Sequence, residues 1–317
     1  MHGSMPRQSL KFRQDGTFTI VQLTDLHWKQ GGERDRQTER LVELVLEKEQ
    51  PDLVFLTGDT IESGGIADPR QAYREAVKAV DRSGIPWAAV FGNHDAEGAV
   101  TKAELLEVQR EHAACLSEAG PETVTGIGNY TLPVYGNDES IAAVLYAMDS
   151  GEYAKPLLPG YDWIRRDQIG WYADESRRYA ADNGGRPLPG LMFFHIPLPE
   201  YVEVWEHESC FGEKHEGVAS PKVNSGMFAA MLEQGNIDGV FVGHDHVNDY
   251  WGELHGMRLC YGRATGYNTY GREGWPRGAR VIKLTEGKRG FDSWLRLEDG
   301  ARVDSQPAHQ PGRKREH

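Results

Sequence analysis

Carboxylate and imidazole side chains gather in five short segments of this 317-residue chain. In chain order, the segments are Asp25-Leu26-His27, Gly58-Asp59, Gly92-Asn93-His94-Asp95, Phe194-His195 and Gly243-His244-Asp245-His246. Together they offer carboxylate oxygens, imidazole nitrogens and one carboxamide oxygen, but no thiolate. This donor set suits divalent transition metals of intermediate hardness, such as Mn, Fe, Zn or Co. The first chemistry that the sequence suggests is therefore metal binding.

The number of donors points to two metal ions. Seven side chains are candidate ligands: Asp25, His27, Asp59, Asn93, His195, His244 and His246. One four-coordinate ion cannot use so many, whereas two ions that share a bridging carboxylate can. Asp59 is the natural bridging residue. His94 is left over beside Asn93, and because histidine titrates near neutral pH, we expect it to act as the catalytic acid.

Each segment by itself has an ordinary structural explanation. An Asp-x-His pair at a strand end can simply be hydrogen-bonded, Gly58-Asp59 can form a turn, and His195 can be a core histidine. Asp95 can either orient His94 or cap the segment that follows it. For the set, all of these explanations would have to hold at once and in this order. We therefore interpret the set as a dinuclear metal site.

Strand-like and helix-like patterns alternate along the chain, and each of the five segments follows an apolar run. Expected strands cover residues 17–23, 52–57, 87–91, 141–148, 191–194, 240–242, 259–261, 281–284 and 294–297, and expected helices cover about 41–46, 71–82, 101–119, 167–183 and 224–234. Thr101 and Glu104 fit a capping box at one helix start. Ligands in layered α/β folds bind beyond the carboxyl ends of strands, so five separate strands are expected to build one site.

The five segments resemble the signature of the calcineurin-like metallophosphoesterase superfamily, which reads Asp-x-His, Gly-Asp, Gly-Asn-His-Asp or -Glu, His, and Gly-His-x-His. The resemblance extends from about Thr17 to Leu284. It implies an α+β fold of four layers, α/β/β/α, with two packed mixed β-sheets flanked by helices. Segments such as 161–164, 195–201 and 260–263 look like the branch related to purple acid phosphatases.

The resemblance also implies a role for each side chain. One ion would be held by Asp25, His27, Asp59 and His246, and the other by Asp59, Asn93, His195 and His244. A hydroxide that bridges the ions would attack the phosphorus atom, and His94 would protonate the leaving group. The purple enzymes have Gly in place of His27 and Tyr in place of Glu62, so no tyrosinate colour is expected. The implied cofactors are two divalent transition-metal ions: Mn, Fe or Zn.

The chain is predicted to hydrolyse phosphate esters, with phosphomonoesters as the favoured substrates. A phosphodiesterase, acting on cyclic nucleotides or other diesters, is an alternative, because fold and metals do not separate the two. A non-catalytic binding module on the same fold is an alternative of another class. A metallo-β-lactamase-like hydrolase is a third, but Asn248-Asp249 after His246 does not match its ligand pattern. Arg263, Tyr267 and Tyr270 lie in a glycine-rich stretch and are candidates for substrate binding.

Composition and charge narrow the possible partners. With 35 basic and 48 acidic residues, the formal net charge is −13, which disfavours nucleic acids and anionic membrane surfaces as partners. A phosphorylated small molecule or a phosphoprotein is the expected substrate. The longest apolar run, 141–148, is too short to cross a bilayer. The three cysteines form no CxxC pair and the N-terminus shows no leader pattern, so we expect a cytoplasmic location, or secretion if a leader has been removed.

The domain organisation is expected to be simple. Residues 17–300 should form a single metallophosphoesterase domain, preceded by an N-terminal extension over residues 1–16. Residues 301–317 contain almost no apolar side chains, so this segment is expected to be a disordered tail.

Overall fold

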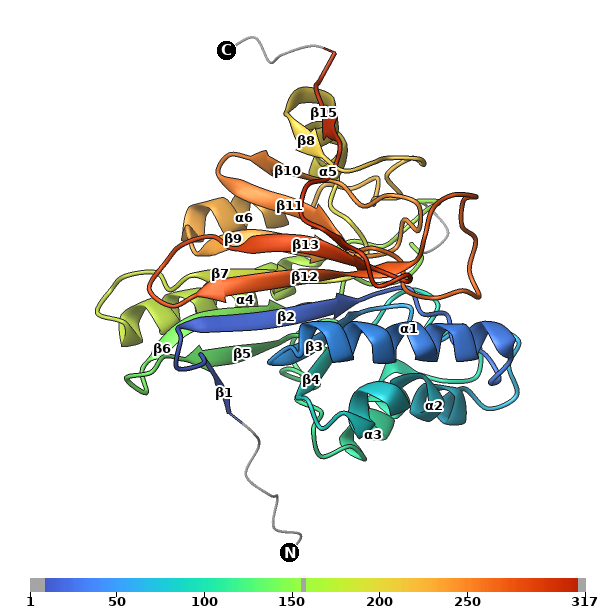
Figure 1. The fold of residues 1–317 in the computed structure, drawn as a ribbon. Helices are drawn as coiled ribbons and strands as arrows, with labels where there is room; N and C mark the ends of the chain where they lie inside the picture. The colour runs from blue at the N-terminus through green and yellow to red at the C-terminus, as the bar shows by residue number, and fades with distance from the viewer. Residues whose placement is uncertain (1–8, 155–157, 313–317) are drawn as a thin grey trace, which may run out of the picture.

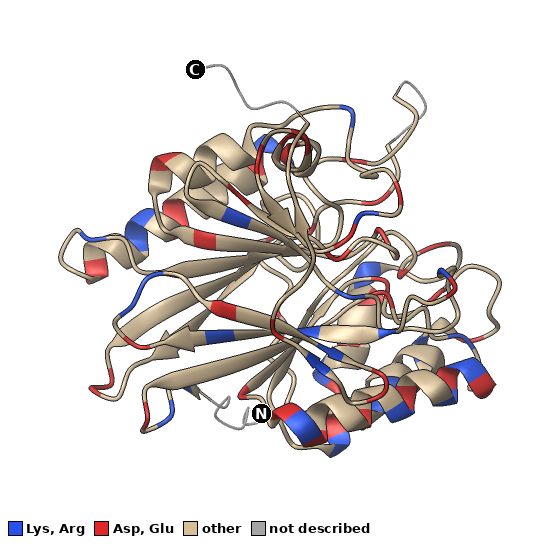
Figure 2. Cartoon of the chain, turned by 45° about the horizontal axis from the view of Figure 1, so that its top comes forward, with Lys and Arg blue, Asp and Glu red and all other residues tan. Residues whose placement is uncertain are grey.

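The structure is a computed structural model that describes residues 9–154 and 158–312. Within these residues, two mixed β-sheets pack face to face, and helices cover both outer faces (Figure 1). The strands in the interior are mostly uncharged, whereas the helices and loops carry residues of both signs (Figure 2). The predicted four-layer α/β/β/α fold is therefore confirmed.

The larger sheet contains nine strands within the described residues. In spatial order they are β1 (Leu10–Lys11), β5 (Tyr130–Tyr135), β6 (Ile141–Ala147), β7 (Gly190–Phe193), β9 (Ile237–Val242), β11 (Met257–Tyr261), β10 (Trp251–Leu254), β8 (Cys210–Phe211) and β15 (Ala308–His309). The central strands β6, β7, β9 and β11 run parallel to one another. Strands β10, β8 and β15 extend the sheet in antiparallel pairs.

The smaller sheet contains six strands in the described part of the chain. Their order is β14 (Arg302–Val303), β13 (Asp292–Leu297), β12 (Gly278–Thr285), β2 (Thr17–Leu23), β3 (Leu53–Thr57) and β4 (Trp87–Val90). Strands β2, β3 and β4 are parallel. Because side chains alternate along a strand, Phe18 and Ile20 of β2 enter the core between the sheets, whereas Val21 and Leu23 face the helices.

Three helices cover each sheet in the described residues. Helices α1 (Glu33–Glu49), α2 (Pro69–Arg82) and α3 (Lys102–Arg110) pack on the smaller sheet, and α4 (Arg166–Asp182), α5 (Glu200–His207) and α6 (Met227–Gln234) pack on the larger one. Their buried faces make two further apolar clusters, one on each outer face of the sheet pair. None of the described helices combines the length and the apolar composition that a membrane crossing requires.

Helix α3 is shorter than expected. The predicted capping box is present, because the Thr101 side chain accepts a hydrogen bond from the Glu104 amide and Glu104 reaches back. The helix ends at Arg110, however, and not near residue 119. The chain beyond it turns back to pair with β4, where the Leu116 amide donates to the Trp87 carbonyl at 2.7 Å. The pattern of apolar residues does not reveal a backbone pairing of this kind, so it could not predict where the helix ends.

The N-terminal extension belongs to the domain. Strand β1 pairs in parallel with β5, and Leu10 and Phe12 are buried in the core between the sheets. The predicted boundary at residue 17 is therefore too late. Residues 1–8 of the predicted extension lie outside the described residues.

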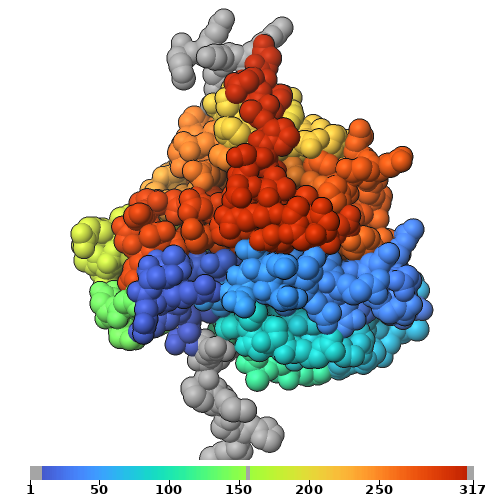
Figure 3. All heavy atoms as spheres, in the orientation of Figure 1, coloured from blue at the N-terminus to red at the C-terminus, as the bar shows by residue number. Residues whose placement is uncertain are grey.

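The predicted disordered tail is ordered over much of its length. Strand β14 pairs with β13, and β15 pairs with β8. His309 stacks on Trp205 at 3.7 Å between ring centroids, and Figure 3 shows this red segment running over the surface of the second half of the chain. The prediction is wrong for these residues because backbone pairing, and not apolar burial, holds the segment. Residues 313–317 lie outside the described residues.

Candidate metal centre

The five predicted segments all lie just beyond the carboxyl ends of strands. Strands β2, β3 and β4 of the smaller sheet lead into three of them, and β7 and β9 of the larger sheet lead into the other two. Parallel neighbours end at the same edge of a sheet, so each group converges. The two edges are also joined, because Gln22 donates to the Val242 carbonyl at 3.0 Å.

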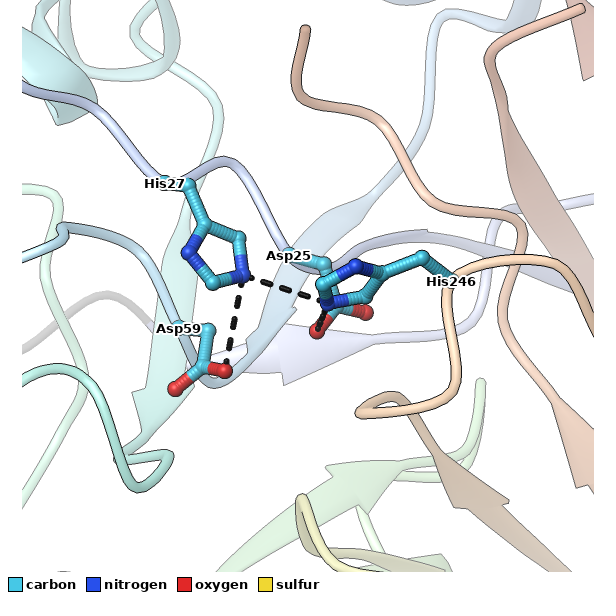
Figure 4. A group of neighbouring side chains, drawn as sticks. All are labelled: Asp25, His27, Asp59 and His246. Atoms are coloured by element: carbon cyan, nitrogen blue, oxygen red, sulfur yellow. Dashed lines mark hydrogen bonds and ion pairs between the residues drawn. The ribbon is translucent and has the colours of Figure 1, made fainter. Parts of the chain in front are cut away.

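The first cluster consists of Asp25, His27, Asp59 and His246, which point toward one another (Figure 4). All four are buried, and each offers a ligand atom within 4.8 Å of the others. The Nε2 atoms of His27 and His246 are 3.2 Å apart, and His27 Nε2 lies 3.5 Å from Asp59 Oδ2. His246 Nε2 lies 3.4 Å from Asp25 Oδ1.

The second cluster contains Asp59, His195 and His244. Asp59 Oδ2 lies 3.1 Å from His195 Nε2, which in turn lies 3.2 Å from His244 Nδ1. Asn93 stands between two residues that contact Asp59, because the His94 amide donates to Asp59 Oδ1 at 2.8 Å and Gly92 packs against the same carboxylate. Asp59 is therefore common to both clusters, as expected of a bridging ligand.

Two buried oxygens of the site accept no hydrogen bond within the described residues: Asp59 Oδ2 and Asn93 Oδ1. Asp59 Oδ2 lies 3.1 Å from His195 Nε2 without a hydrogen bond between them. Neither Asp25 nor Asp59 forms an ion pair with a lysine or arginine of the described chain. A buried polar oxygen without a partner and a buried carboxylate without a cation are costly, so this donor set fits bound metal ions.

The backbone is strained at the candidate ligands. Four of them have a positive φ: Asp25 (54°), His27 (45°), Asp59 (49°) and His244 (78°). This left-handed region is unfavourable for residues other than glycine, and such strain is concentrated at functional sites. Hydrogen bonds hold the bends, since the Asp25 amide donates to the Gly58 carbonyl and the His27 amide donates to the Asp59 carbonyl.

Glycines let the segments approach one another. A Cβ atom on Gly92 would lie 2.2 Å from Asp59 Oδ1, and one on Gly243 would lie 1.9 Å from Thr24 Oγ1. Both distances are far inside van der Waals contact. The first residues of the Gly-Asn-His-Asp and Gly-His-x-His segments must therefore be glycine, because any side chain there would clash with the site.

Three of the four candidate ligand imidazoles have a partner at the ring nitrogen that points away from the cluster. His27 Nδ1 lies 3.0 Å from a Glu62 carboxylate oxygen, and His195 Nδ1 lies 2.8 Å from the Thr57 carbonyl. His246 Nδ1 lies 2.5 Å from Thr269 Oγ1. Such partners set the tautomer and leave the inward nitrogen free to bind a metal. The sequence analysis did not identify Glu62 or Thr269 in this role.

His94 stands apart from the two ligand clusters. Its side chain is 28% exposed, and its Nδ1 lies 3.1 Å from a Glu97 carboxylate oxygen. Asp95 instead accepts hydrogen bonds from the Gly92 and Ile61 amides, so it fixes the loop and does not orient the His94 ring. Glu97, which the sequence analysis missed, holds that ring.

The three residues predicted to bind substrate have different environments. Arg263 is buried, where it pairs with Asp249 at 2.7 Å and stacks on Trp275, so its role in substrate binding stays a prediction. The Tyr267 hydroxyl is bonded to Glu298, and its role in substrate binding also stays a prediction. Only the Tyr270 ring contacts a candidate ligand: its centroid lies 4.2 Å from that of His246.

Electrostatics favour charged carboxylates at neutral pH. Burial alone would raise the pKa of Asp25, but the hydrogen bond and charge of His246 lower that pKa to about 2. The pKa of Asp59 is likewise held well below its usual value by His195 and His27 despite burial. Burial would lower the pKa of His195, yet the Asp59 charge raises it to about 9. The site is thus built around two anions that attract positive charge.

Comparisons with known proteins agree with this geometry. Residues 18–248 match the model of the calcineurin-like phosphoesterase family. Probable inactive purple acid phosphatase 29 of Arabidopsis thaliana is 35% identical over 92% of this chain and 85% of its own length. Phosphatase DCR2 of Saccharomyces cerevisiae is 34% identical over 92% of this chain and 55% of its own length.

A solved structure supports the fold independently. The crystal structure of a dimetal phosphatase from Danio rerio superposes with a TM-score of 0.56 at 12% identity, over 87% of this chain and 98% of that one. The purple acid phosphatase names among the sequence relatives support the predicted branch. This chain belongs to the calcineurin-like phosphoesterase family.

Proposed function

We propose that the chain is a phosphomonoesterase that uses two divalent metal ions, Mn, Fe or Zn. One observation carries the proposal: two buried ligand clusters share Asp59, beside a histidine that belongs to neither cluster. In this proposal the first ion is held by Asp25, His27, Asp59 and His246, and the second by Asp59, Asn93, His195 and His244. A pair of bound cations would supply Lewis acidity toward the phosphoryl group and would acidify a water molecule for attack.

The chain's own residues supply the other steps. His94 is partly exposed and donates a proton to the leaving-group oxygen, a contribution of about 10² to 10⁴ in rate. Its Nδ1–H donates to Glu97, which leaves Nε2 as the proton donor toward substrate. The Asp59 carboxylate accepts a hydrogen bond from the His94 amide. This bond fixes the distance between the proposed bridging ligand, Asp59, and the proposed acid, His94.

Phosphomonoesters are favoured because sequence relatives carry the name phosphatase, and a small phosphorylated molecule or a phosphoprotein is the proposed substrate. The decisive experiment loads chelated protein with Mn, Fe(II) or Zn, counts bound metal and measures kcat/KM on a panel. The panel contains 4-nitrophenyl phosphate, phosphotyrosine, bis(4-nitrophenyl) phosphate and a cyclic nucleotide. We expect about two ions per chain and higher kcat/KM for the monoesters. Faster turnover of the diesters would favour the phosphodiesterase alternative.

A non-catalytic binding module is the second candidate, because several relatives are named as probable inactive phosphatases. Against it, this chain has all seven candidate ligands and His94, with the geometry described above. The same panel separates the two candidates. Protein that binds two metal ions but turns over neither monoesters nor diesters would support the binding module.

A further inference from the structure

Two exposed tyrosine rings lie beside the metal centre. In the described residues four large hydrophobic side chains are exposed: Tyr153 (45%), Leu158 (39%), Leu232 (38%) and Tyr270 (54%). Tyr153 and Tyr270 each contact a histidine of the site. Single exposed apolar residues are common, but two exposed aromatic rings beside a reactive site indicate a surface that binds a ligand.

Successive ring contacts join the two tyrosines to the site. The Tyr153 ring meets His94 edge-on at 6.3 Å between centroids, and His94 lies 5.1 Å from His27. His27 lies 4.9 Å from His246, which lies 4.2 Å from Tyr270. Tyr153 is thus the aromatic neighbour of the proton donor, and Tyr270 is that of a candidate ligand. Under the proposed function, a leaving group that His94 protonates would depart next to Tyr153.

Hydrogen bonds hold both tyrosines by their hydroxyl groups. The Tyr153 hydroxyl donates to Glu97 at 3.1 Å and accepts from the Asn93 amide group at 3.0 Å. The Tyr270 hydroxyl donates to Glu216 at 2.6 Å. A ring that is fixed in this way loses little conformational entropy when a ligand packs against its face. These exposed rings are therefore preorganised contact surfaces.

The charges beside the rings limit the kind of leaving group. The carboxylates of Glu97 and Glu216 bind the two hydroxyls, and Glu62 pairs with His27. Among the described residues, Lys29 forms a long ion pair with Glu62 at 3.9 Å, and Arg277 donates to the Tyr270 carbonyl at 2.9 Å. An anionic leaving group would be repelled by this acidic surface. An uncharged aromatic group would not be repelled and could use the ring faces.

We propose that the site selects phosphate monoesters whose alcohol carries a planar, uncharged aromatic group, with Tyr153 and Tyr270 as the contact residues. This inference rests on the proposed function for its substrate chemistry. An aryl ester and a nucleoside monophosphate both meet the description, since each combines a phosphate with a planar ring system. Stacking of a ring on an aromatic side chain accounts for about a tenfold gain in affinity.

The test uses metal-loaded protein and phosphonates, which cannot be hydrolysed at the P–C bond, in calorimetric titrations. Benzylphosphonate should bind about tenfold more tightly than cyclohexylmethylphosphonate, which is apolar and similar in size but not planar. Tyr270→Ala should reduce this ratio to about two, whereas Tyr270→Phe keeps the ring and should retain most of it. Leu232→Ala, which removes the exposed hydrophobic side chain on α6, is the matched control and should leave the ratio unchanged.

Equal binding of the two phosphonates to the unaltered protein, or an unchanged ratio in Tyr270→Ala, would overturn the proposal. A phosphonate analogue of adenosine monophosphate distinguishes nucleotides from aryl esters as the preferred substrates. Tighter binding of this analogue than of benzylphosphonate would indicate a nucleotide, and weaker binding would indicate an aryl ester. Calorimetry measures binding without turnover, so the aromatic preference and the phosphatase activity are tested independently. Selective binding without hydrolysis would refute the proposed phosphatase activity, and hydrolysis without selectivity would refute only the aromatic preference.

Discussion

Two carboxylate–imidazole pairs near the metal centre have almost the same local geometry. Glu62 pairs with His27 at 3.0 Å, and Glu97 pairs with His94 at 3.1 Å, in each case through Nδ1 of the ring. Both glutamate side chains are 29% exposed. The histidines differ, because His27 is only 2% exposed whereas His94 is 28% exposed.

The difference shows what decides the function of such a pair. His27 directs Nε2 toward Asp59 and His246, so it is enclosed by other candidate ligands. His94 belongs to neither ligand cluster and has Tyr153 beside its ring. In both pairs the glutamate fixes the orientation of the imidazole ring and its tautomer. Under the proposed function, what the opposite nitrogen faces then separates the metal ligand His27 from the proton donor His94.

Removing the group on which both pairs depend should have the largest effect. Asp59 belongs to both ligand clusters and also fixes the His94 backbone. Asp59→Ala should lose bound metal and should reduce turnover to background. Metal content of the purified variant and its rate with 4-nitrophenyl phosphate check this. A variant that kept two ions and measurable turnover would show that Asp59 does not bridge them.

Exchanging the two histidines for alanine should separate metal binding from proton donation. His94→Ala should keep its metal content and lose about 10² to 10⁴ in kcat. His27→Ala should instead lose metal, with the stoichiometry falling toward one ion per chain. Metal analysis alongside kcat distinguishes the two variants. Loss of metal from His94→Ala would contradict the assignment of His94 as the acid.

The sequence identified the inner residues of the site because they are local. Asp25 and His27, or His244 and His246, stand within two positions of each other, and each group follows an apolar strand. The strand ends then bring the groups together. The partners at the other ring nitrogens follow no such rule. Thr269 is 23 positions from His246, so only the fold reveals their contact.

The same limit explains other features that the sequence does not reveal. Arg263 follows a strand in a glycine-rich stretch, but nothing in the sequence shows that the fold buries it against Asp249. Strands β14 and β15 have two residues each and are held by backbone hydrogen bonds, so hydropathy does not reveal them. Strand β2, in contrast, has the alternating apolar pattern that both of its faces require, and it was predicted with its observed limits.

Changing the two glutamates should give smaller effects of two different kinds. Glu62→Gln should weaken metal binding about 10- to 100-fold, because it acts on a ligand. Glu97→Gln should lower kcat about 10- to 100-fold for ethyl phosphate, whose leaving group needs a proton. It should leave 2,4-dinitrophenyl phosphate within about twofold, since that leaving group departs unprotonated.

Each glutamate variant is the control for the other. Metal affinity is measured by competition with a chelator, and kcat is measured for both esters at saturating metal. A general structural defect would lower both rates equally in both variants. If Glu97→Gln slowed the two esters to the same extent, Glu97 would not act through the proton donor.

The smallest expected effect concerns stability without metal. Burial would lower the pKa of His27, but Glu62, Asp59 and Asp25 raise it, and the pKa of His195 is raised to about 9. A raised histidine pKa means that the folded state holds the proton more tightly than the unfolded state, whose value is about 6.5. The stabilisation is therefore complete below about pH 6.5 and is lost as the pH rises through 9.

Metal ions would replace these protons, so only the chelated protein should melt at a lower temperature at pH 9 than at pH 6.5. Part of this loss comes from the His27–Glu62 pair, and it should therefore shrink in Glu62→Gln. It should stay unchanged in Glu97→Gln, because Glu97 does not contact either of these histidines. Thermal melts of the three proteins at both pH values, with and without metal, check this. If the melting temperatures of Glu62→Gln and Glu97→Gln depended equally on pH, the His27–Glu62 pair would not contribute the stabilisation proposed here.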